Sequence, residues 1–318
     1  TREVIVQWRT NPEIILMDCD SSIPFEVGVS GGGKALLFFR EERMAREFVR
    51  AFTRELLTRA PGLQLAVAIG EGFNPREEFA LQLKNLFEQL VKNRNKYFPL
   101  TSLPDHGITA TGPDGGLNLF SELRKRYVSC ESAAKLEAAQ SAKRLLKQEY
   151  QEYLQHLDLT DQVDQLGQVE GDSYTATVHI DGNSIGNWFQ NSTDLIDYRF
   201  RSLDMECITG ECFQKIITDV VNLKDMLNNI PGFKVEQYLP VLPIVISGDD
   251  VTFICHGKLG LYLAETYIKL WQKRANDNLK NLPEGGFTAC AGIAIARTKH
   301  PFYRTYQVAE ELCSLAKR

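Results

Sequence analysis

The chain has 318 residues, of which 36 are Lys or Arg and 41 are Asp or Glu, so its formal net charge is −5. This acidic balance argues against a protein that mainly coats nucleic acid, because such proteins usually carry a basic excess. No apolar run approaches the ~18 residues of a membrane-spanning helix, so we expect no membrane partner. Since the sequence begins at Thr1 rather than Met, we expect a trimmed or partial chain of about two domains.

Seven cysteines are scattered along the chain without a CxxC pair. Two of them, Cys255 and Cys290, lie within apolar segments that favour strands. An odd and scattered set of this kind is typical of reduced, buried thiols in a cytoplasmic protein. The same spacing does not favour a zinc site.

Two segments of the chain share one pattern, which predicts a β-hairpin. The first covers residues 25–39, FEVGVSGGGKALLFF, and the second covers residues 242–255, LPIVISGDDVTFIC. In each, two apolar runs flank a turn that contains glycine. A helix and then a strand are predicted after each hairpin, at residues 40–59 and 62–70 in the first copy and at 258–274 and 286–296 in the second.

The second copy also has a strand before its hairpin, Tyr174–Ile180, and a long helical region over residues 185–229. Its order is therefore that of a ferredoxin-like βαββαβ unit. The first copy is less complete, because only a few residues separate a candidate first strand, Glu13–Met17, from the hairpin. Between the copies lies a Gly- and Pro-rich loop, followed by a stretch over Ser129–His156 whose composition favours a helix.

We therefore predict an α+β protein with two ferredoxin-like domains and a helical linker between them. Residues 1–98 would form the first, degenerate domain, with the glycine-rich hairpin. Residues 99–170 would form the loop and the helical linker, and residues 171–318 would form the second domain.

Three carboxylates stand where a metal site could form. Asp181 ends the first strand of the second copy, and Asp249 and Asp250 occupy its hairpin turn. In a βαββαβ sheet these strands are neighbours, so we expect the three side chains to converge. Clustered carboxylates suit Mg²⁺ or Mn²⁺, which could hold a nucleoside triphosphate during an in-line displacement at phosphorus. A plain turn, in which an Asp pair beside glycine is common, is the alternative.

Neighbouring residues suit a nucleotide. Asn183, Ser184 and Gly186 lie in a short segment that leads toward a helix, where backbone amides would favour phosphate. Gly248 would let a base or ribose approach the turn. Lys317 closes the last predicted helix, where it either balances the helix dipole or binds a triphosphate.

The first hairpin has glycines where the second has carboxylates. Aligning the two turns places Gly32 and Gly33 opposite Asp249 and Asp250, so the first copy cannot bind metal in the same way. Gly31, Gly32 and Gly33 form either a simple tight turn or a surface against which a second nucleotide lies. The stretch GVSGGGK (28–34) is not a P-loop, because Ala follows it where Ser or Thr is needed and a strand follows instead of a helix.

This ordered set of motifs resembles the large cyclase subunit (Cas ten) of type III CRISPR–Cas complexes. The resemblance rests on GGGKALLFF, SCESAAKLEAA, HIDGNSIG, SGDDVTFIC and the closing residues 290–318, and it spans nearly the whole chain. More distantly, the second copy is similar to GGDEF diguanylate cyclases and class III nucleotidyl cyclases. The resemblance implies two facing palm domains with two nucleotides between them. It also implies an antiviral enzyme that converts ATP to cyclic oligoadenylate and releases pyrophosphate.

The resemblance also implies roles for individual residues. Asp181 and Asp249 would hold the metal ions, and Asp250 would complete the site or help to deprotonate the attacking 3′-hydroxyl. Lys317 matches a lysine that contacts phosphates in the GGDEF relatives. The other residues expected at the nucleotides are Gly31, Gly32 and Gly33 on the acceptor side, and Asn183, Ser184, Gly186, Ser247 and Gly248 around the carboxylates.

Two departures from the family pattern put the rate or the base preference in doubt. Ser247 stands where the family has the first glycine of GGDD, and Asn183 stands where it often has a further Asp. The sequence also lacks the zinc-binding insertion and the His-Asp nuclease motif of the family.

The partners implied are nucleoside triphosphates, with ATP favoured, together with subunits of a CRISPR complex and RNA. A homodimer could form if the chain acts alone. The alternative function is a catalytically weak subunit that binds nucleotide or serves as a scaffold. Template-directed polymerisation is a third hypothesis, which the acidic balance disfavours.

Overall fold

The computed structural model describes residues 8–31, 33–70, 72, 78–94, 121–123, 126–169, 171 and 173–317. The chain forms two compact units that do not follow chain order. Unit 1 contains Thr1–Ile14, Val27–Leu36 and Lys147–Arg318, and unit 2 contains Ile15–Glu26 and Leu37–Leu146. The domain boundaries expected after residues 98 and 170 stay a prediction.

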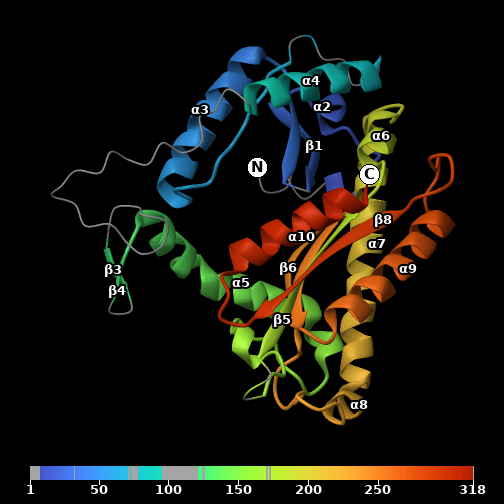
Figure 1. Cartoon of the computed structure of the whole chain (residues 1–318). Helices are drawn as coiled ribbons and strands as arrows, with labels where there is room; N and C mark the ends of the chain where they lie inside the picture. The colour runs from blue at the N-terminus through green and yellow to red at the C-terminus, as the bar shows by residue number, and fades with distance from the viewer. Residues whose placement is uncertain are drawn as a thin grey trace. The chain divides into compact units, whose positions relative to one another are not determined.

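The main sheet of unit 1 has four strands in the order β6-β7-β5-β8, and all neighbours are antiparallel (Figure 1). The strands are β5 (Tyr174–Gly182), β6 (Val241–Ser247), β7 (Asp250–His256) and β8 (Ala289–Arg297). The helices are α6 (Ile185–Gln190), α7 (Leu195–Asn222) and α8 (Lys224–Asn228) between β5 and β6, α9 (Gly260–Asn278) before β8, and α10 (Phe302–Ala316) after it. This order of elements and strands is that of a ferredoxin-like βαββαβ unit, which confirms the order predicted for the second copy.

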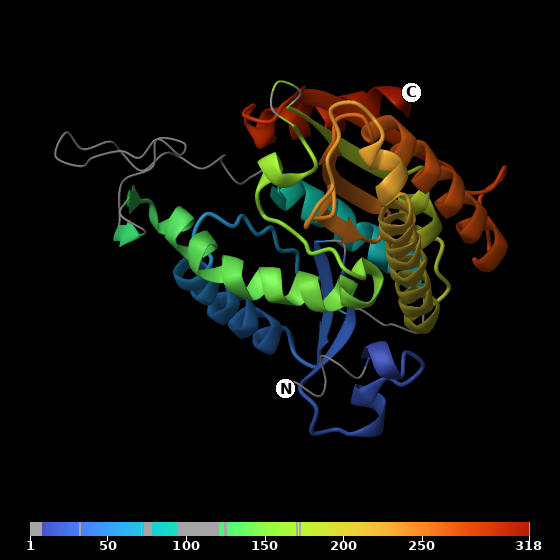
Figure 2. The same ribbon diagram turned by 90° about the horizontal axis from the view of Figure 1, so that it is seen from below.

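The two faces of this sheet are covered by different helices. Figures 1 and 2 show α7 and α9 on one side of the sheet and α10 on the other. On the first side, a Cβ at Gly260 of α9 would lie 2.5 Å from the Cβ of Ala176. On the second side, the hydroxyls of Thr177 and Thr305 of α10 lie 2.8 Å apart. Because side chains alternate along a strand, Asp181 belongs to the α10 side, four residues after Thr177.

Helix α7 is the longest helix that crosses the sheet, and its sequence explains both its start and its buried face. The carboxylate of Asp194 accepts a hydrogen bond from the backbone N–H of Asp197 at 2.8 Å, which is a typical N-cap. Met205, Cys212 and Ile216 then recur at helical spacing and are buried. The helix is therefore packed in the core along its length, and it can position residues at the end of the sheet.

The first copy contains the predicted hairpin. Strands β1 (Phe25–Gly31) and β2 (Lys34–Phe39) form a two-stranded sheet, and α3 (Glu42–Arg59) and α4 (Phe79–Arg94) follow in the chain. The helix predicted over residues 40–59 is therefore confirmed as α3.

Two other strands predicted for this copy are wrong. Glu13–Met17 is not a strand, since the short helix α2 (Leu16–Cys19) begins there, and the backbone N–H of Met17 donates to the Glu26 carboxylate at 3.1 Å. Residues 63–70 form no strand either, and the Val67 carbonyl accepts from the side-chain amide of Asn93 at 2.8 Å. Side chains thus satisfy backbone groups that a neighbouring strand would otherwise pair. Over the described residues before 95, the first copy has one hairpin rather than a four-stranded sheet.

The segment between the copies contains the predicted helix as α5 (Cys130–Leu154), preceded by a small hairpin of β3 (Ser121–Leu123) and β4 (Arg126–Val128). The predicted loop over residues 99–116 lies outside the described residues. All seven cysteines are free thiols, and Cys212, Cys255 and Cys313 are buried. No helix in the described part of the chain is both long and apolar enough to span a membrane.

Candidate functional site

The end of the unit 1 sheet brings together the three carboxylates that the sequence singled out. Asp181 of β5 is the direct cross-strand partner of Asp250 of β7, and Asp250 is in turn paired with Ser247 of β6. Asp249 lies in the turn before β7. Gly182 permits a close approach here, because a Cβ at this position would lie 3.0 Å from the Cβ of Asp249. Opposed residues of antiparallel strands have Cβ atoms about 5 Å apart, so the carboxylates form one cluster.

Side chains of α7 and α9 hold the turn that carries Asp249 and Asp250. Gly248 has a φ of +62°, a backbone conformation that favours glycine. Its carbonyl accepts a hydrogen bond from the hydroxyl of Thr209 on α7, and the indole N–H of Trp271 on α9 donates to the same hydroxyl oxygen at 3.2 Å. Both side chains are buried. The position of the turn is therefore fixed by hydrogen bonds that two buried side chains make.

Two carboxylates of the cluster, Asp249 and Asp250, have raised pKa values. Burial raises the pKa of Asp249 from 3.8 to about 6, and the negative charge of Asp181 adds to this effect. Burial also raises the pKa of Asp250; His179 opposes this rise, whereas Asp181 and Glu310 add to it. A cation placed among these groups would relieve both the desolvation and the repulsion.

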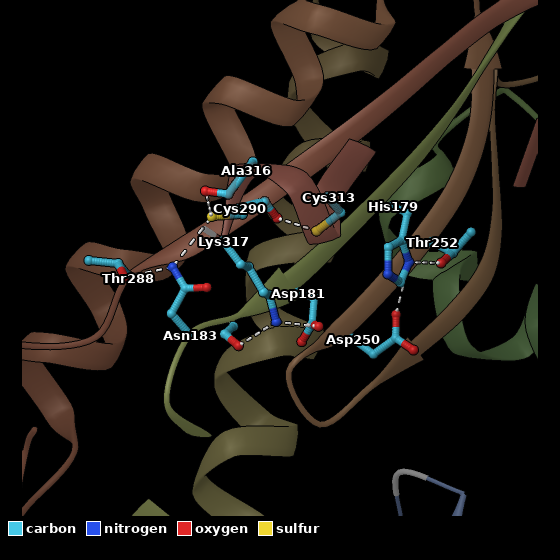
Figure 3. Close-up of polar contacts among 11 residues, drawn as sticks. His179, Asp181, Asn183, Asp250, Thr252, Thr288, Cys290, Cys313, Ala316 and Lys317 are labelled. Carbon is cyan, nitrogen blue, oxygen red and sulfur yellow. Dashed lines mark hydrogen bonds and ion pairs between the residues drawn. The ribbon is translucent and has the colours of Figure 1, made fainter. Parts of the chain in front are cut away.

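The protein itself places one positive charge at this cluster. Lys317, directly after α10, forms an ion pair through its Nζ with the carboxylate of Asp181 and donates to the carbonyl of Gly182 at 3.2 Å (Figure 3). The close packing of α10 on β8 brings the lysine there. A Cβ at Gly292 of β8 would lie 1.8 Å from the carbonyl oxygen of Ala309 in α10. Lys317 therefore lies at the predicted site, in contact with a carboxylate.

The sequence motifs did not point to the residues that surround Asp250. The Nδ1 atom of His179 lies 3.0 Å from Oγ1 of Thr252 and 3.4 Å from Oδ1 of Asp250 (Figure 3). The imidazole also packs edge-on against the ring of Tyr306 in α10, with centroids 5.7 Å apart. A signal was present in the sequence, because His179 precedes Asp181 by two residues and Thr252 follows Asp250 by two. Residues at this spacing share one face of a strand.

The residues predicted after β5 lie beside the cluster, but Asn183 is turned toward β8. Its Nδ2 donates to Oγ1 of Thr288 at 2.9 Å and contacts Sγ of Cys290 at 3.4 Å (Figure 3). Its Oδ1 is buried and has no hydrogen-bond partner in the described part of the chain. Ser184 and Gly186 are exposed, and the helix α6 that they open has only 6 residues. The nucleotide contacts expected of these residues stay predictions.

Within unit 1, a buried arginine holds the strand that leads to the glycine-rich turn. Arg199 of α7 is fully buried, and its Nε donates to the carbonyl of Gly28 in β1 at 3.0 Å. At the tip, Gly33 has a φ of +70°, and no atom of the described residues lies within 4 Å of a Cβ built at Gly31 or Gly33. Gly32 lies outside the described residues. The space beside the tip leaves room for a ligand without identifying one.

The chemistry of the cluster fits a divalent ion, although the geometry is not that of a formed metal site. Among the described residues, no group of three or more His, Cys, Asp or Glu side chains is arranged to hold a metal. The donors are nevertheless carboxylate oxygens, which Mg²⁺ and Mn²⁺ prefer, and the Asp250 side chain is 45% exposed and so can be reached by an ion. A metal ion on Asp181 would compete with Lys317 for this carboxylate.

Comparison with known proteins gives fold matches only. No family model matches the sequence, and no curated protein matches it significantly. The α+β fold is similar to that of a Csm1–Csm4 cassette in complex with one ATP, with a TM-score of 0.56 and 15% identity, over 99% of this chain and 49% of that chain. Csm1 of T. onnurineus gives a TM-score of 0.53 and 15% identity, over 99% and 46%. A Csm1–Csm4 cassette in complex with cA3 gives 0.52 and 15%, over 98% and 48%.

These neighbours are Csm1 subunits, of the Cas ten type that the motifs resemble. At this low identity, the similarity concerns the fold alone. The chain spans about half the length of the Csm1 structures that it matches. The comparison therefore supports a relationship to Csm1 at the level of the fold.

Proposed function

We propose that the protein is a metal-dependent nucleotidyltransferase that joins nucleoside triphosphates through 3′–5′ bonds into a cyclic oligonucleotide. ATP is the favoured substrate, and cyclic oligoadenylate is the product, used as a messenger in antiviral defence. The main support is the cross-strand pairing of Asp181 with Asp250, with Asp249 in the adjoining turn. Csm1–Csm4 cassettes of similar fold have been solved with ATP and with cA3, which supports adenine nucleotides as ligands.

The three carboxylates and Lys317 would have different roles in the reaction. Asp181, Asp249 and Asp250 would hold Mg²⁺ or Mn²⁺, which when bound would supply charge stabilisation at the reacting phosphate. Asp250 would accept the proton of the attacking 3′-hydroxyl. The new bond joins the 3′-oxygen to the α-phosphorus, and the bond from that phosphorus to pyrophosphate breaks. Lys317 would leave Asp181, bind the triphosphate and stabilise the negative charge on the leaving pyrophosphate.

The glycine-rich segments would hold the two nucleotides. On the acceptor side, the nucleotide would lie along the first hairpin, where side chains are missing at the tip. On the donor side, the phosphates and the ribose would lie near the second turn and the segment after β5. The residues proposed for these contacts are Gly31, Gly32 and Gly33 on the acceptor side, and Asn183, Ser184, Gly186, Ser247 and Gly248 on the donor side.

A second candidate function is a catalytically weak subunit that binds nucleotide or serves as a scaffold. The ion pair between Lys317 and Asp181 favours this alternative, because it already neutralises one carboxylate of the cluster. For either function, we propose other subunits of a type III CRISPR complex and RNA as partners, or a second copy if the chain acts alone.

The direct test is product formation. The protein is incubated with each nucleoside triphosphate and Mg²⁺ or Mn²⁺, and pyrophosphate and cyclic products are measured by mass spectrometry. We expect cyclic oligoadenylate from the wild type and none from Asp249→Ala, with the exposed Asp164→Ala as the matched control. Equal cyclisation by Asp249→Ala would disprove the assigned metal site. Binding of ATP without any product would favour the second candidate.

A further inference from the structure

The two oxygens of the Asp250 carboxylate lie in different environments. Oδ1 is buried and has no hydrogen-bond partner among the residues that the structure describes, whereas the side chain as a whole is 45% exposed. The accessible oxygen is therefore Oδ2. A buried carboxylate oxygen without a donor is costly, so the groups that face Oδ1 determine how this carboxylate is held.

His179 is the group that faces Oδ1. Its side chain is only 8% exposed, and its Nδ1 lies 3.4 Å from that oxygen. His179 and Thr252 are direct cross-strand partners, just as Asp181 and Asp250 are, and only the Ile180–Val251 pair separates these two pairs along β5 and β7. The four side chains therefore share one face of the sheet. Thr252 Oγ1, at 3.0 Å from Nδ1, and the ring of Tyr306 limit the movement of the imidazole (Figure 3).

The chemistry of these neighbours selects the tautomer of His179. A carboxylate oxygen only accepts hydrogen bonds, whereas a hydroxyl oxygen can donate or accept. An unprotonated Nδ1 would place a lone pair against Oδ1. A proton on Nδ1 would instead place a donor beside both Oδ1 of Asp250, at 3.4 Å, and Oγ1 of Thr252, at 3.0 Å.

We propose that His179, fixed by Thr252, is a positioning residue that holds Oδ1 of Asp250 and leaves Oδ2 for the divalent ion. The inference rests on the proposed function. Hydrogen bonds from a surrounding residue orient a metal-ligating side chain, and their loss typically lowers metal affinity by about 10- to 100-fold. A purely structural His179, packed on Tyr306, would not affect metal affinity in this way.

Three variants separate a positioning role of His179 from a purely structural one. His179→Phe keeps a ring beside Tyr306 but removes the donor, and Thr252→Val removes the hydroxyl with little change of shape. His179→Asn restores an N–H near the position of Nδ1. Thr177→Val is the matched control, because Thr177 is also buried and hydrogen-bonded on the same face of β5, but lies further from the carboxylates.

The experiment measures Mn²⁺ binding by the electron paramagnetic resonance of free Mn²⁺, with a non-reactive ATP analogue present. We expect the dissociation constant to rise about tenfold or more in His179→Phe and Thr252→Val, to recover in His179→Asn, and to stay within about twofold in the control. If His179→Phe fails to fold, the Mn²⁺ affinity of Thr252→Val tests the inference instead. Unchanged affinity in the folded variants overturns the inference alone, whereas a wild type that binds no Mn²⁺ overturns the proposed function as well.

Discussion

Gly292 of β8 lies so close to α10 that a Cβ on it would be 1.8 Å from the carbonyl oxygen of Ala309. The same Cβ would lie 2.6 Å from the backbone nitrogen of Cys313. Both neighbours are backbone atoms of a helix, which cannot turn aside as a flexible side chain can. Only glycine therefore allows this approach, and the approach brings Lys317, at the end of α10, to Asp181.

Gly292→Ala should therefore destabilise the protein and displace the end of α10. We expect a loss of about 2–3 kcal/mol in the free energy of unfolding, as for an overpacked core position. Urea denaturation measures this loss. Gly210→Ala in α7 is the control, because no atom lies within 4 Å of its Cβ and alanine favours a helix. Wild-type stability in Gly292→Ala would contradict the packing of α10 on β8.

Asp249 should make stability depend on pH. Its pKa is raised from 3.8 to about 6 by burial and by Asp181, so the folded state binds this proton more tightly than the unfolded state. The resulting stabilisation is full below pH 3.8 and is lost as the pH rises through about 6. Asp249→Asn stays neutral, so it should be more stable than the wild type at pH 7 by about 1–2 kcal/mol, and equally stable at pH 4.

This difference is measured by urea denaturation in EDTA between pH 4 and pH 8, with Asp164→Asn as the exposed control. A difference between Asp249→Asn and the wild type that does not change with pH would show that Asp249 is not a buried, repelled carboxylate.

Lys317→Met should affect the reaction more than the fold. The lysine touches Asp181 from an exposed helix end, so its loss removes the positive charge proposed to move to the triphosphate. We expect kcat/KM for ATP to fall about tenfold or more, as for a lost charged hydrogen bond, with little change in the melting temperature. Lys273→Met, on the exposed face of α9, is the control. An unchanged kcat/KM would exclude Lys317 from the phosphate site.

Thr209→Val should loosen the turn that carries Asp249 and Asp250. The change leaves the Gly248 carbonyl and the Trp271 indole N–H without their shared partner, at a cost of about 1–3 kcal/mol. Hydrogen exchange of the turn amides should accelerate, and product formation should fall. Thr209→Ser keeps the hydroxyl and should behave like the wild type; if both variants exchange alike, the relay does not hold the turn.

Patterns of local sequence predicted most of the second copy. Alternating apolar residues and glycine turns gave the strands β5 to β8, and helical spacing gave α9 and α10. The convergence of Asp181 with the turn at 249–250 followed from the βαββαβ order, because this order makes β5 and β7 neighbours. These features depend on short segments and on one common topology.

The remainder depends on contacts between distant residues, which the sequence pattern does not specify. The strand expected at residues 62–70 is missing, and the side-chain amide of Asn93 donates a hydrogen bond to the Val67 carbonyl that a neighbouring strand would otherwise pair. The role of Gly292 depends on how closely α10 packs, and the position of His179 depends on the register between β5 and β7. A single histidine in an apolar strand gives no sign of its partner until that register is known.

The most direct test of the central claim locates the metal ion. A crystal of the protein grown with Mn²⁺ and a non-reactive ATP analogue should give an anomalous difference peak among the carboxylates of Asp181, Asp249 and Asp250, with Lys317 moved from Asp181 to the phosphates. A bound analogue with no peak at this cluster, and with Lys317 still paired to Asp181, would contradict the proposal that the cluster binds a catalytic metal.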